Sequence, residues 1–347
     1  MCNICSEHLC IGPDGAIVKL PQPSTREGDA VRGPVSYYDP DEVEPMVTAA
    51  VMYYQAHRSQ AQIARHLDVS RPTVSRLLAR ARQLGIVRIE IVPPTADPGL
   101  GKDLQERLGL RGIHIAAGLA DPDDPAPVLA GRLNDALAGI GLQPGDVLVV
   151  GWGRAIYSLG RYELAPLPGV VVVPALGGGA EDRPWFQANE ITRRWAVTLH
   201  GTPRYLHAPA FVSSALKRSL VHEEGVHSTL DLWDRAKVAL VGIGAYPKPD
   251  SSLVAVGFSD GDPAIADATG DVVGRFFTDD GTLIHYPDEP RLLGITPDRM
   301  RRIPHVVGIS VGADKARAIV GAARARLVNT LVIDAGTARE VAALLDA

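Results

Sequence analysis

Apolar runs as short as buried strands alternate with amphipathic helical patterns along most of the chain. The apolar runs fall at residues 112–118, 146–153, 170–179, 204–211, 237–245, 305–312 and 329–336. The helical patterns fall at residues 126–140, 189–201, 313–327 and 337–347. A strand, a glycine and then a helix, repeated in this way, is typical of a parallel sheet with helices on both faces. The pattern therefore predicts a doubly wound, mostly parallel α/β fold for residues 94–347.

A different pattern, with two closely spaced helix starts, precedes this region. Ser59 and Gln62 have the spacing of a capping box, which predicts a helix that begins at Gln60. Ser70 is a suitable cap for a second helix that has Pro72 in its first turn, where a missing N–H costs nothing. The apolar stripe of that second helix is formed by Val74, Leu77, Leu78 and Ala81.

Two flanking elements complete this predicted domain, residues 41–93. An amphipathic helix from Glu44 to about His57 is expected to bury Met46, Val47, Ala50 and Tyr54. The segment IVRIEIV at 86–92 is expected to form a wing or a linker strand. Short helices with this spacing predict a helix-turn-helix DNA-binding domain.

Arginines concentrate in the helix-turn-helix segment. Residues 58–82 contain six arginines and one acid, Asp68, which is a net charge of +5, so the rest of a chain with a total of −5 carries −10. The outward positions of the second helix suit contacts to guanine and to phosphate. The predicted DNA-binding residues are Ser70, Arg71, Pro72, Thr73, Arg76 and Arg80. The alternative is that the arginines merely solvate the helix, which explains neither the two helix starts nor the lack of glutamate and lysine.

The composition is that of a globular protein, because 46% of the 347 residues are apolar. No uninterrupted apolar run reaches the length of about 18 residues that a spanning helix needs. We therefore expect a cytoplasmic protein with no membrane partner. A net charge of −5 argues against a protein that coats nucleic acid with its whole surface.

All three cysteines lie in the opening stretch CNICSEHLC that follows the first methionine. Cys2, Cys5, His8 and Cys10 are potential metal ligands, but a tetrahedral site normally uses a second ligand pair beyond a loop, and the sequence has none. We expect residues 1–40 to be a flexible extension that holds no metal, and residues 1–35 to be dispensable for both effector and operator binding. The alternative is a metal- or redox-sensing regulator that uses this cluster, next to a hairpin that turns at 13–15.

Three of the predicted strands end in glycine, with GWG at 151–153, GGG at 177–179 and GISVGADK at 308–315. Ligands of parallel sheets bind beyond the carboxyl ends of the strands, where glycine lets backbone N–H groups approach an anion. Tight turning alone also explains each glycine. The sequence contains neither a Walker loop nor a GxGxxG fingerprint, so no cofactor is expected.

Eight sequence segments, taken together in their order and spacing, identify a protein family more specifically than any one segment does. They are IARHLDVSRPTVSRLLARARQLGIVRIEI, VVGWGRA, ALGGGAEDRPWFQAN, LHAPAFV, VALVGIGA, TGDVVGRFFTDDGTLI, SVGADKARAI and NTLVIDAGTA. In this order they resemble the SorC family of sugar-binding transcriptional regulators. The resemblance runs from about Glu44 to the C-terminus.

This resemblance implies an effector domain related in fold to ribose-5-phosphate isomerase and glucosamine-6-phosphate deaminase. It implies three partners: operator DNA, a phosphorylated sugar or related carbohydrate that alters operator affinity, and further copies of the chain in a dimer or tetramer. Lys315, at the start of a helix, combines a point charge with a field that favours phosphate. The effector-binding residues that the resemblance implies are Gly151, Gly153, Arg154, Gly177, Gly178, Gln187, Asp271 and Lys315.

Two positions depart from the family pattern. Ala155 stands where members commonly have threonine, and Leu176 stands where binders of sugar bisphosphates have arginine. A missing hydroxyl and a missing guanidinium disfavour a doubly phosphorylated ligand, although Arg154 compensates in part. We expect a monophosphate or an unphosphorylated polyol.

The rival class is an enzyme, since the fold relatives isomerise or deaminate sugar phosphates. Asp271, Asp314 or His207 are the candidate bases, and Lys315 is able to form a Schiff base that binds a ligand without turnover. The spacing singles out neither a carboxylate pair nor a histidine–carboxylate pair, and fold alone says little about activity. We therefore expect no enzymatic activity.

Overall fold

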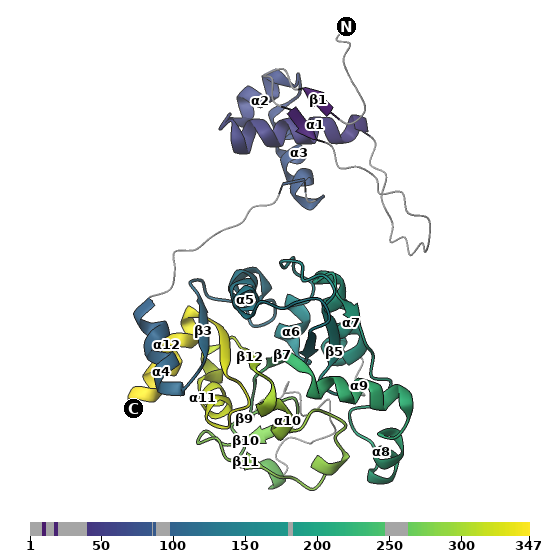
Figure 1. Cartoon of the computed structure of the whole chain (residues 1–347). Coiled ribbons are helices and arrows are strands. Elements are labelled where there is room, and N and C mark those ends of the chain that lie inside the picture. The colour runs from purple at the N-terminus through teal and green to yellow at the C-terminus, as the bar shows by residue number, and fades with distance from the viewer. Residues whose placement is uncertain are drawn as a thin grey trace. The chain divides into compact units, whose positions relative to one another are not determined.

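The computed structural model of the protein describes residues 9–11, 17–19, 40–84, 86–87, 98–179, 183–246 and 263–347. The chain forms two compact units, Met1–Ile91 and Val92–Ala347 (Figure 1). Over the described ranges, every helix is too short or too polar to cross a bilayer.

The described part of the first unit consists of a hairpin and a group of short helices. Its elements are β1 (Leu9–Ile11), β2 (Ile17–Lys19), α1 (Pro40–Ala50) with a π-helical turn at Val51–Gln55, α2 (Gln60–His66) and α3 (Arg71–Gln83). β1 pairs antiparallel with β2, as the turn signal at 13–15 predicts. The predicted helix starts after Ser59 and Ser70 are also confirmed.

Side-chain caps explain why α2 and α3 begin where they do. The Ser59 backbone N–H donates to Gln62 Oε1 (2.9 Å), and the Gln62 N–H donates to Ser59 Oγ (3.3 Å). At the next start, Ser70 Oγ accepts the Thr73 N–H (3.3 Å). Each bond satisfies a backbone donor that has no partner inside its helix. The short linker between the two helices therefore has a defined path.

A small apolar core holds these helices together. It is formed by Ala49, Ala50, Ile63, Ala64, Val74 and Leu78. Val47 was expected in this core but is 40% exposed, because α1 turns Met46, Ala49 and Ala50 inward instead. In the expected wing, Ile86 and Val87 form a bend rather than a strand, and residues 88–92 lie outside the described ranges.

The second unit is built on a seven-stranded sheet with the order β3-β13-β12-β7-β4-β5-β6. Every neighbouring pair in this sheet is parallel. The strands are β3 (Gly112–Ala116), β4 (Val147–Val150), β5 (Val171–Pro174), β6 (Thr202–Pro203), β7 (Ala236–Gly242), β12 (His305–Ile309) and β13 (Thr330–Asp334). The side chains of β4 are all buried, as expected of a strand with helices on both faces. The predicted doubly wound α/β fold is confirmed.

Helices cover both faces of this sheet (Figure 1). On one face lie α5 (Ala126–Ile140), α6 (Arg154–Leu159) and α7 (Ala188–Thr198), and on the other lie α9 (Glu224–Asp234), α10 (Pro297–Arg302) and α11 (Ala316–Arg324). Beside β3, α4 (Pro98–Leu108) packs against α12 (Ala335–Asp346), and α8 (Ser214–Leu220) precedes α9. The helices predicted at 126–140, 189–201, 313–327 and 337–347 all form, with shifts of a few residues at their ends.

Two features of this unit differ from the prediction. The segment 204–211, expected as a strand, follows the short β6 and makes only isolated bridges, Pro209 with Gly178 and Phe211 with Leu292. A second, antiparallel sheet was not expected; it contains β8 (Gly244–Ala245), β9 (Gly270–Val272), β10 (Arg275–Phe277) and β11 (Leu283–Ile284). Strands of two or three residues are too short to show a periodic pattern.

A buried arginine joins this small sheet to the main one. Arg275 in β10 is 5% exposed, and its Nε and Nη2 donate to the carbonyl oxygens of Ile295 and Gly294 (both 3.2 Å). Its Nη1 donates to Glu289 Oε1 (3.1 Å). The same loop reaches the end of β5, where the Ile295 N–H donates to the carbonyl oxygen of Ala175 (2.8 Å). Arg275 therefore fixes the loop that packs beside β5.

We expect Arg275→Met to lower the free energy of unfolding by about 3–5 kcal/mol, because two carbonyl groups lose this donor and the Glu289 carboxylate keeps only the exposed His285 of its two described side-chain partners. Urea unfolding followed by circular dichroism measures the change. Arg317→Ala is the matched control, since Arg317 pairs with Asp279 at an exposed site. Its expected loss is below about 1 kcal/mol, and equal losses in the two variants would contradict the anchoring role of Arg275.

Candidate functional site

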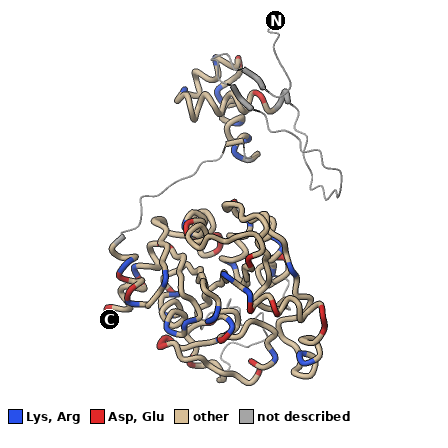
Figure 2. Tube along the Cα trace, in the orientation of Figure 1, with Lys and Arg blue, Asp and Glu red and all other residues tan. Residues whose placement is uncertain are grey.

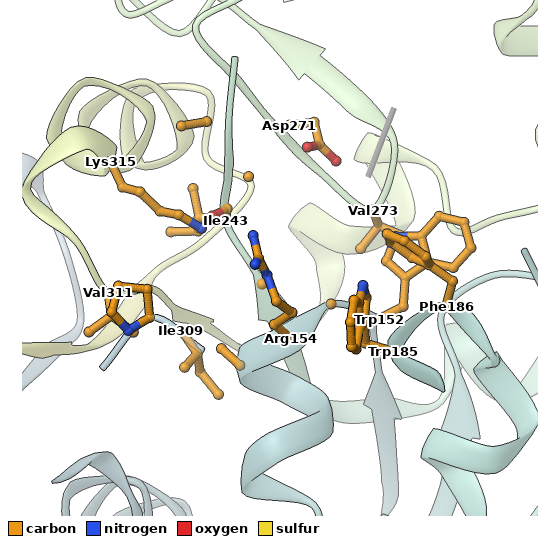
Figure 3. A pocket seen from close by; sticks show the side chains of 16 residues that line it. Trp152, Arg154, Trp185, Phe186, Ile243, Asp271, Val273, Ile309, Val311 and Lys315 are labelled. Carbon is orange, nitrogen blue, oxygen red and sulfur yellow. Dashed lines mark hydrogen bonds between the residues drawn. The ribbon is translucent and has the colours of Figure 1, made fainter. Parts of the chain in front are cut away.

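A pocket lies where the carboxyl ends of β12, β7 and β4 meet, because these three parallel strands are neighbours in the sheet. The centre of a water molecule can occupy about 100 Å³ of this cavity, whereas a site for one water needs roughly 10–15 Å³ measured in the same way. The lining residues are Pro122, Trp152, Gly153, Arg154, Ala155, Trp185, Phe186, Gly242, Ile243, Gly244, Ala245, Asp271, Val273, Ile309, Val311 and Lys315 (Figure 3).

The loop after β4 supplies the first cation. Gly153 has φ +115°, a conformation that favours glycine, and its N–H donates to the carbonyl oxygen of Trp185 (2.8 Å). Arg154 follows as the first residue of α6, and its side chain is 32% exposed. Its Nη1 donates to Asp123 Oδ1 (3.0 Å), and that carboxylate is 79% exposed. The Arg154 guanidinium therefore lines the pocket while an exposed carboxylate holds it from one side.

The loop after β12 supplies the second cation. Lys315 ends a single 3₁₀ turn, Ala313–Lys315, and directly precedes α11. Its Nζ donates to the carbonyl oxygen of Ile243 at the end of β7 (3.0 Å). An ammonium group beside the start of a nine-residue helix adds its charge to the positive end of the helix dipole. This corner of the pocket favours an anion.

Asp271 brings a buried carboxylate to the same pocket. It lies in β9, is 4% exposed, and its Oδ2 accepts the Gly274 N–H (3.1 Å). Gly244 pairs with it across β8 and β9, and a Cβ on Gly244 would stand 2.1 Å from Asp271 Oδ1. Only glycine at 244 leaves room for this carboxylate. Asp271 therefore offers a buried acceptor for a ligand hydroxyl.

Aromatic side chains form another part of the wall. The Trp152 and Phe186 rings meet edge to face with centroids 5.3 Å apart, and Trp185 contacts Phe186 at 6.3 Å. Figure 3 shows these three rings on one side of the pocket, Lys315 on the opposite side, and Arg154 between them. None of these three rings was predicted from the sequence to line the pocket, although Trp152 stands inside the GWG motif and Trp185 and Phe186 directly precede Gln187.

The structure brings together four of the eight effector residues implied by the family resemblance: Gly153, Arg154, Asp271 and Lys315. The other four, Gly151, Gly177, Gly178 and Gln187, do not line the pocket. Gly177 is needed for close packing, because a Cβ there would stand 2.4 Å from the carbonyl carbon of Pro209. The Gly178 N–H donates to the carbonyl oxygen of Ala208 (3.0 Å), and Gln187 stands at the start of α7.

The two positions that depart from the family pattern, and the three candidate bases, also divide into residues that line the pocket and residues that do not. Ala155 lines the pocket, whereas Leu176 is fully buried in the core. Among the three candidate bases, Asp271 lines the pocket, His207 is exposed and does not, and Asp314 lies in the turn before Lys315 without lining it.

The predicted DNA-binding residues lie at the start and on the outer side of α3. Ser70, Arg71, Pro72, Arg76 and Arg80 are exposed, and Thr73 is partly buried. Ser70 Oγ lies 2.8 Å from Thr73 Oγ1, which in turn accepts from Arg76 Nη2 (3.4 Å). This chain of bonds holds the Arg76 guanidinium near the N-terminal end of the helix. Figure 2 shows the basic residues of α2 and α3 in blue.

The cysteine cluster falls almost wholly on residues that the structure does not describe. Cys2, Cys5 and His8 lie outside the described ranges, and Cys10 is in β1, of which only the backbone pairing is described. Elsewhere in the described chain, His, Cys, Asp and Glu side chains form no group of three or more placed to hold a metal ion.

Two family models match the chain. The model described as "Putative sugar-binding domain" matches residues 92–343, and a helix-turn-helix domain model matches residues 48–90. These matches coincide with the α/β unit that holds the pocket and with the helices that carry the arginines.

Relatives match both units at once. The deoxyribonucleoside regulator of Bacillus subtilis (strain 168) is 30% identical over 314 residues, which are 87% of this chain and 98% of the relative. The sorbitol operon regulator of Klebsiella pneumoniae is 31% identical over 317 residues, 88% of this chain and 98% of the relative. The crystal structure of the full-length sorbitol operon regulator SorC from Klebsiella pneumoniae superposes with a TM-score of 0.66 at 28% identity, covering 88% of this chain and 99% of that one.

The sugar-binding model covers most of the chain, and the relatives share the helix-turn-helix as well as the α/β unit. The chain therefore belongs to the SorC family of sugar-binding transcriptional regulators.

Proposed function

We propose that α3 binds operator DNA and that a carbohydrate effector in the pocket of the α/β unit changes the affinity of this binding. The observation that carries the proposal is the meeting of Arg154, Lys315 and the buried Asp271 at the carboxyl ends of the central strands. Two cations suit an anionic group, and a carboxylate suits hydroxyl donors. A ligand with both features is a sugar phosphate or a polyol phosphate.

The effector in this proposal carries at most one phosphate. Leu176, at the position where bisphosphate binders of the family have arginine, is in the core and is not available to a second phosphate. Names of relatives agree with a small carbohydrate ligand, since one is a deoxyribonucleoside regulator and another a sorbitol operon regulator. We propose that Gly153, Arg154, Asp271 and Lys315 contact the effector, and that Gly151, Gly177, Gly178 and Gln187 shape the wall around it.

Catalytic turnover is not part of the proposed function. Within the described lining, Asp271 is the one carboxylate, histidine is absent, and one oxygen of Asp271 already accepts a backbone N–H. The relatives are named as transcriptional regulators, which supports a binding role.

The DNA-binding half of the proposal assigns α3 to the major groove. Arg71 and Arg76 stand near its N-terminal end, which is where recognition helices contact base edges. Arg80 lies one turn further along and suits a phosphate. Proteins of this class bind paired half-sites, so we propose that the chain acts as a dimer or tetramer.

We expect Lys315→Ala to weaken binding of a phosphorylated effector by about 10- to 100-fold, because a hydrogen bond from a charged group contributes about 1.5–3 kcal/mol. Operator binding without effector should stay unchanged. Calorimetry with sorbitol phosphate, fructose phosphate, ribose phosphate and deoxyribose phosphate measures the first effect, and fluorescence anisotropy with labelled operator measures the second.

Lys102→Ala is the control for this variant, since Lys102 on α4 is 80% exposed and pairs only with Glu106 on the same helix among the contacts the structure describes. An effector response of the Lys315 variant that equals that of the Lys102 variant would show that the phosphate binds elsewhere.

We expect Arg76→Ala to cost about 1–3 kcal/mol of binding to a selected operator and to relax its sequence preference. Arg80→Ala should weaken binding to every sequence alike and reduce the salt slope by about one. Salt titrations on an operator that the protein itself selects from random duplexes give both quantities. Arg218→Ala on the exposed side of α8 is the control, and unchanged operator discrimination in the Arg76 variant would exclude its base contact.

A further inference from the structure

The three buried tryptophans of the α/β unit differ in one respect. Trp195 Nε1 donates to the carbonyl oxygen of Ile156 (3.0 Å), and Trp233 Nε1 donates to the carbonyl oxygen of Pro174 (2.8 Å). Trp152 is 4% exposed, and its Nε1 has no hydrogen-bond partner in the described part of the chain. Trp152 is also the one of the three that lines the pocket.

Packing holds the Trp152 indole where it is. On either side of it, the Gly151 N–H donates to the carbonyl oxygen of Leu240 and the Gly153 N–H to that of Trp185 (both 2.8 Å). The indole and the Phe186 ring contact each other edge to face at an interplanar angle of 76°. Contacts within the described chain therefore hold both the backbone and the ring of Trp152.

An unpaired buried N–H carries a free-energy cost of about 1–3 kcal/mol. Folded proteins pair nearly all such groups, so an exception in a binding pocket points to a partner that comes from outside the chain. The indole N–H donates only, which requires that partner to be an acceptor. A ligand oxygen in the pocket meets this requirement.

The position of Trp152 shows which part of the ligand it meets. Lys315 and Arg154 offer charge to an anionic group, while the rings of Trp152, Trp185 and Phe186 form the opposite side (Figure 3). Aromatic faces suit the C–H groups of a carbohydrate. An anion binds the two nearby cations more strongly than it binds a neutral N–H, so the indole N–H suits an uncharged oxygen. The uncharged carbon and hydroxyl portion of the effector therefore belongs at the aromatic side.

We propose that the Trp152 Nε1–H recognises a hydroxyl oxygen on the uncharged portion of the effector, and that this contact makes the pocket select a polyhydroxylated ligand over a bare anion. This inference rests on the proposed function, in which the same pocket binds the effector. Asp271 supplies the complementary acceptor, so hydroxyl groups find both a donor and an acceptor in the pocket. Arg154 and Lys315 then bind the phosphate.

The test compares Trp152→Phe with Trp233→Phe in the full-length protein. Both variants keep an aromatic ring and lose an indole N–H, but only Trp152 lines the pocket, and the Trp233 N–H already donates to the Pro174 carbonyl oxygen. Calorimetry uses sorbitol phosphate, fructose phosphate, ribose phosphate, deoxyribose phosphate and unphosphorylated sorbitol, with inorganic phosphate as the anion that lacks a carbon chain. For the tightest carbohydrate of the panel, we expect Trp152→Phe to weaken binding about tenfold and Trp233→Phe to leave it unchanged.

Inorganic phosphate tests the cationic side of the pocket without the aromatic side, because it has no carbon chain. Its binding should be the same in wild type and Trp152→Phe but weaker in Lys315→Ala. A carbohydrate that binds wild type and Trp152→Phe equally, while Lys315→Ala weakens it, would overturn the role of Trp152 and leave the proposed function standing. A wild-type protein that binds no carbohydrate of the panel would overturn the proposed function and this inference together.

A spectroscopic measurement covers the case in which Trp152→Phe fails to fold. The indole N–H resonances of wild-type protein labelled with ¹⁵N-tryptophan are assigned by elimination with the Trp185, Trp195 and Trp233 phenylalanine variants. We expect the Trp152 proton to move downfield when the tightest carbohydrate binds, and the Trp195 and Trp233 protons to stay in place because their bonds are already made. An unmoved Trp152 proton in the saturated complex would overturn the proposal.

Discussion

The parallel pairing of β7 with β4 on one side and β12 on the other is the constraint on which the pocket depends. Parallel strands send their carboxyl ends to the same edge of the sheet, so the loops after residues 150, 242 and 309 are forced together. Each loop then contributes different groups: Arg154 and the Trp152 indole after β4, the Ile243 carbonyl that Lys315 binds after β7, and Lys315 after β12. No single loop has the chemistry of the site.

The two cations of this pocket already have hydrogen-bond partners within the chain. Lys315 Nζ donates to the Ile243 carbonyl oxygen, and Arg154 pairs with Asp123. The second pair is exposed on the Asp123 side, and pairs of this kind contribute at most about 1 kcal/mol. In the proposed complex, an anionic ligand replaces the Asp123 carboxylate at small cost, and a ligand oxygen accepts the Trp152 N–H, which has no partner among the described residues. Both exchanges favour an occupied pocket.

Regulation requires the effector to bind the operator-bound and unbound proteins with different affinities, since a ligand with equal affinity for both shifts nothing. The two units carry separate cores, one of a few small residues around Ile63 and Val74, the other around the seven-stranded sheet. The arginines of α3 and the lining of the pocket share no residue. In the proposed function, a variant of either site therefore removes contacts to one ligand only, and any effect on the other ligand comes through the coupling between the two sites.

The local elements and the fold class follow from the sequence alone. Capping at Ser59 and Ser70, helical stripes and short apolar runs all depend on residues a few positions apart, so the helix-turn-helix and the parallel sheet were predictable from pattern. The family resemblance added four residues that line the pocket, Gly153, Arg154, Asp271 and Lys315. Which residues of the glycine loops reach the pocket depends on the tertiary packing. Gly177 packs closely against Ala208 and Pro209, whereas Trp152, Trp185 and Phe186 converge at the pocket. Such contacts join segments far apart in sequence and leave no periodic signal along the chain, because their partners are chosen by packing in three dimensions.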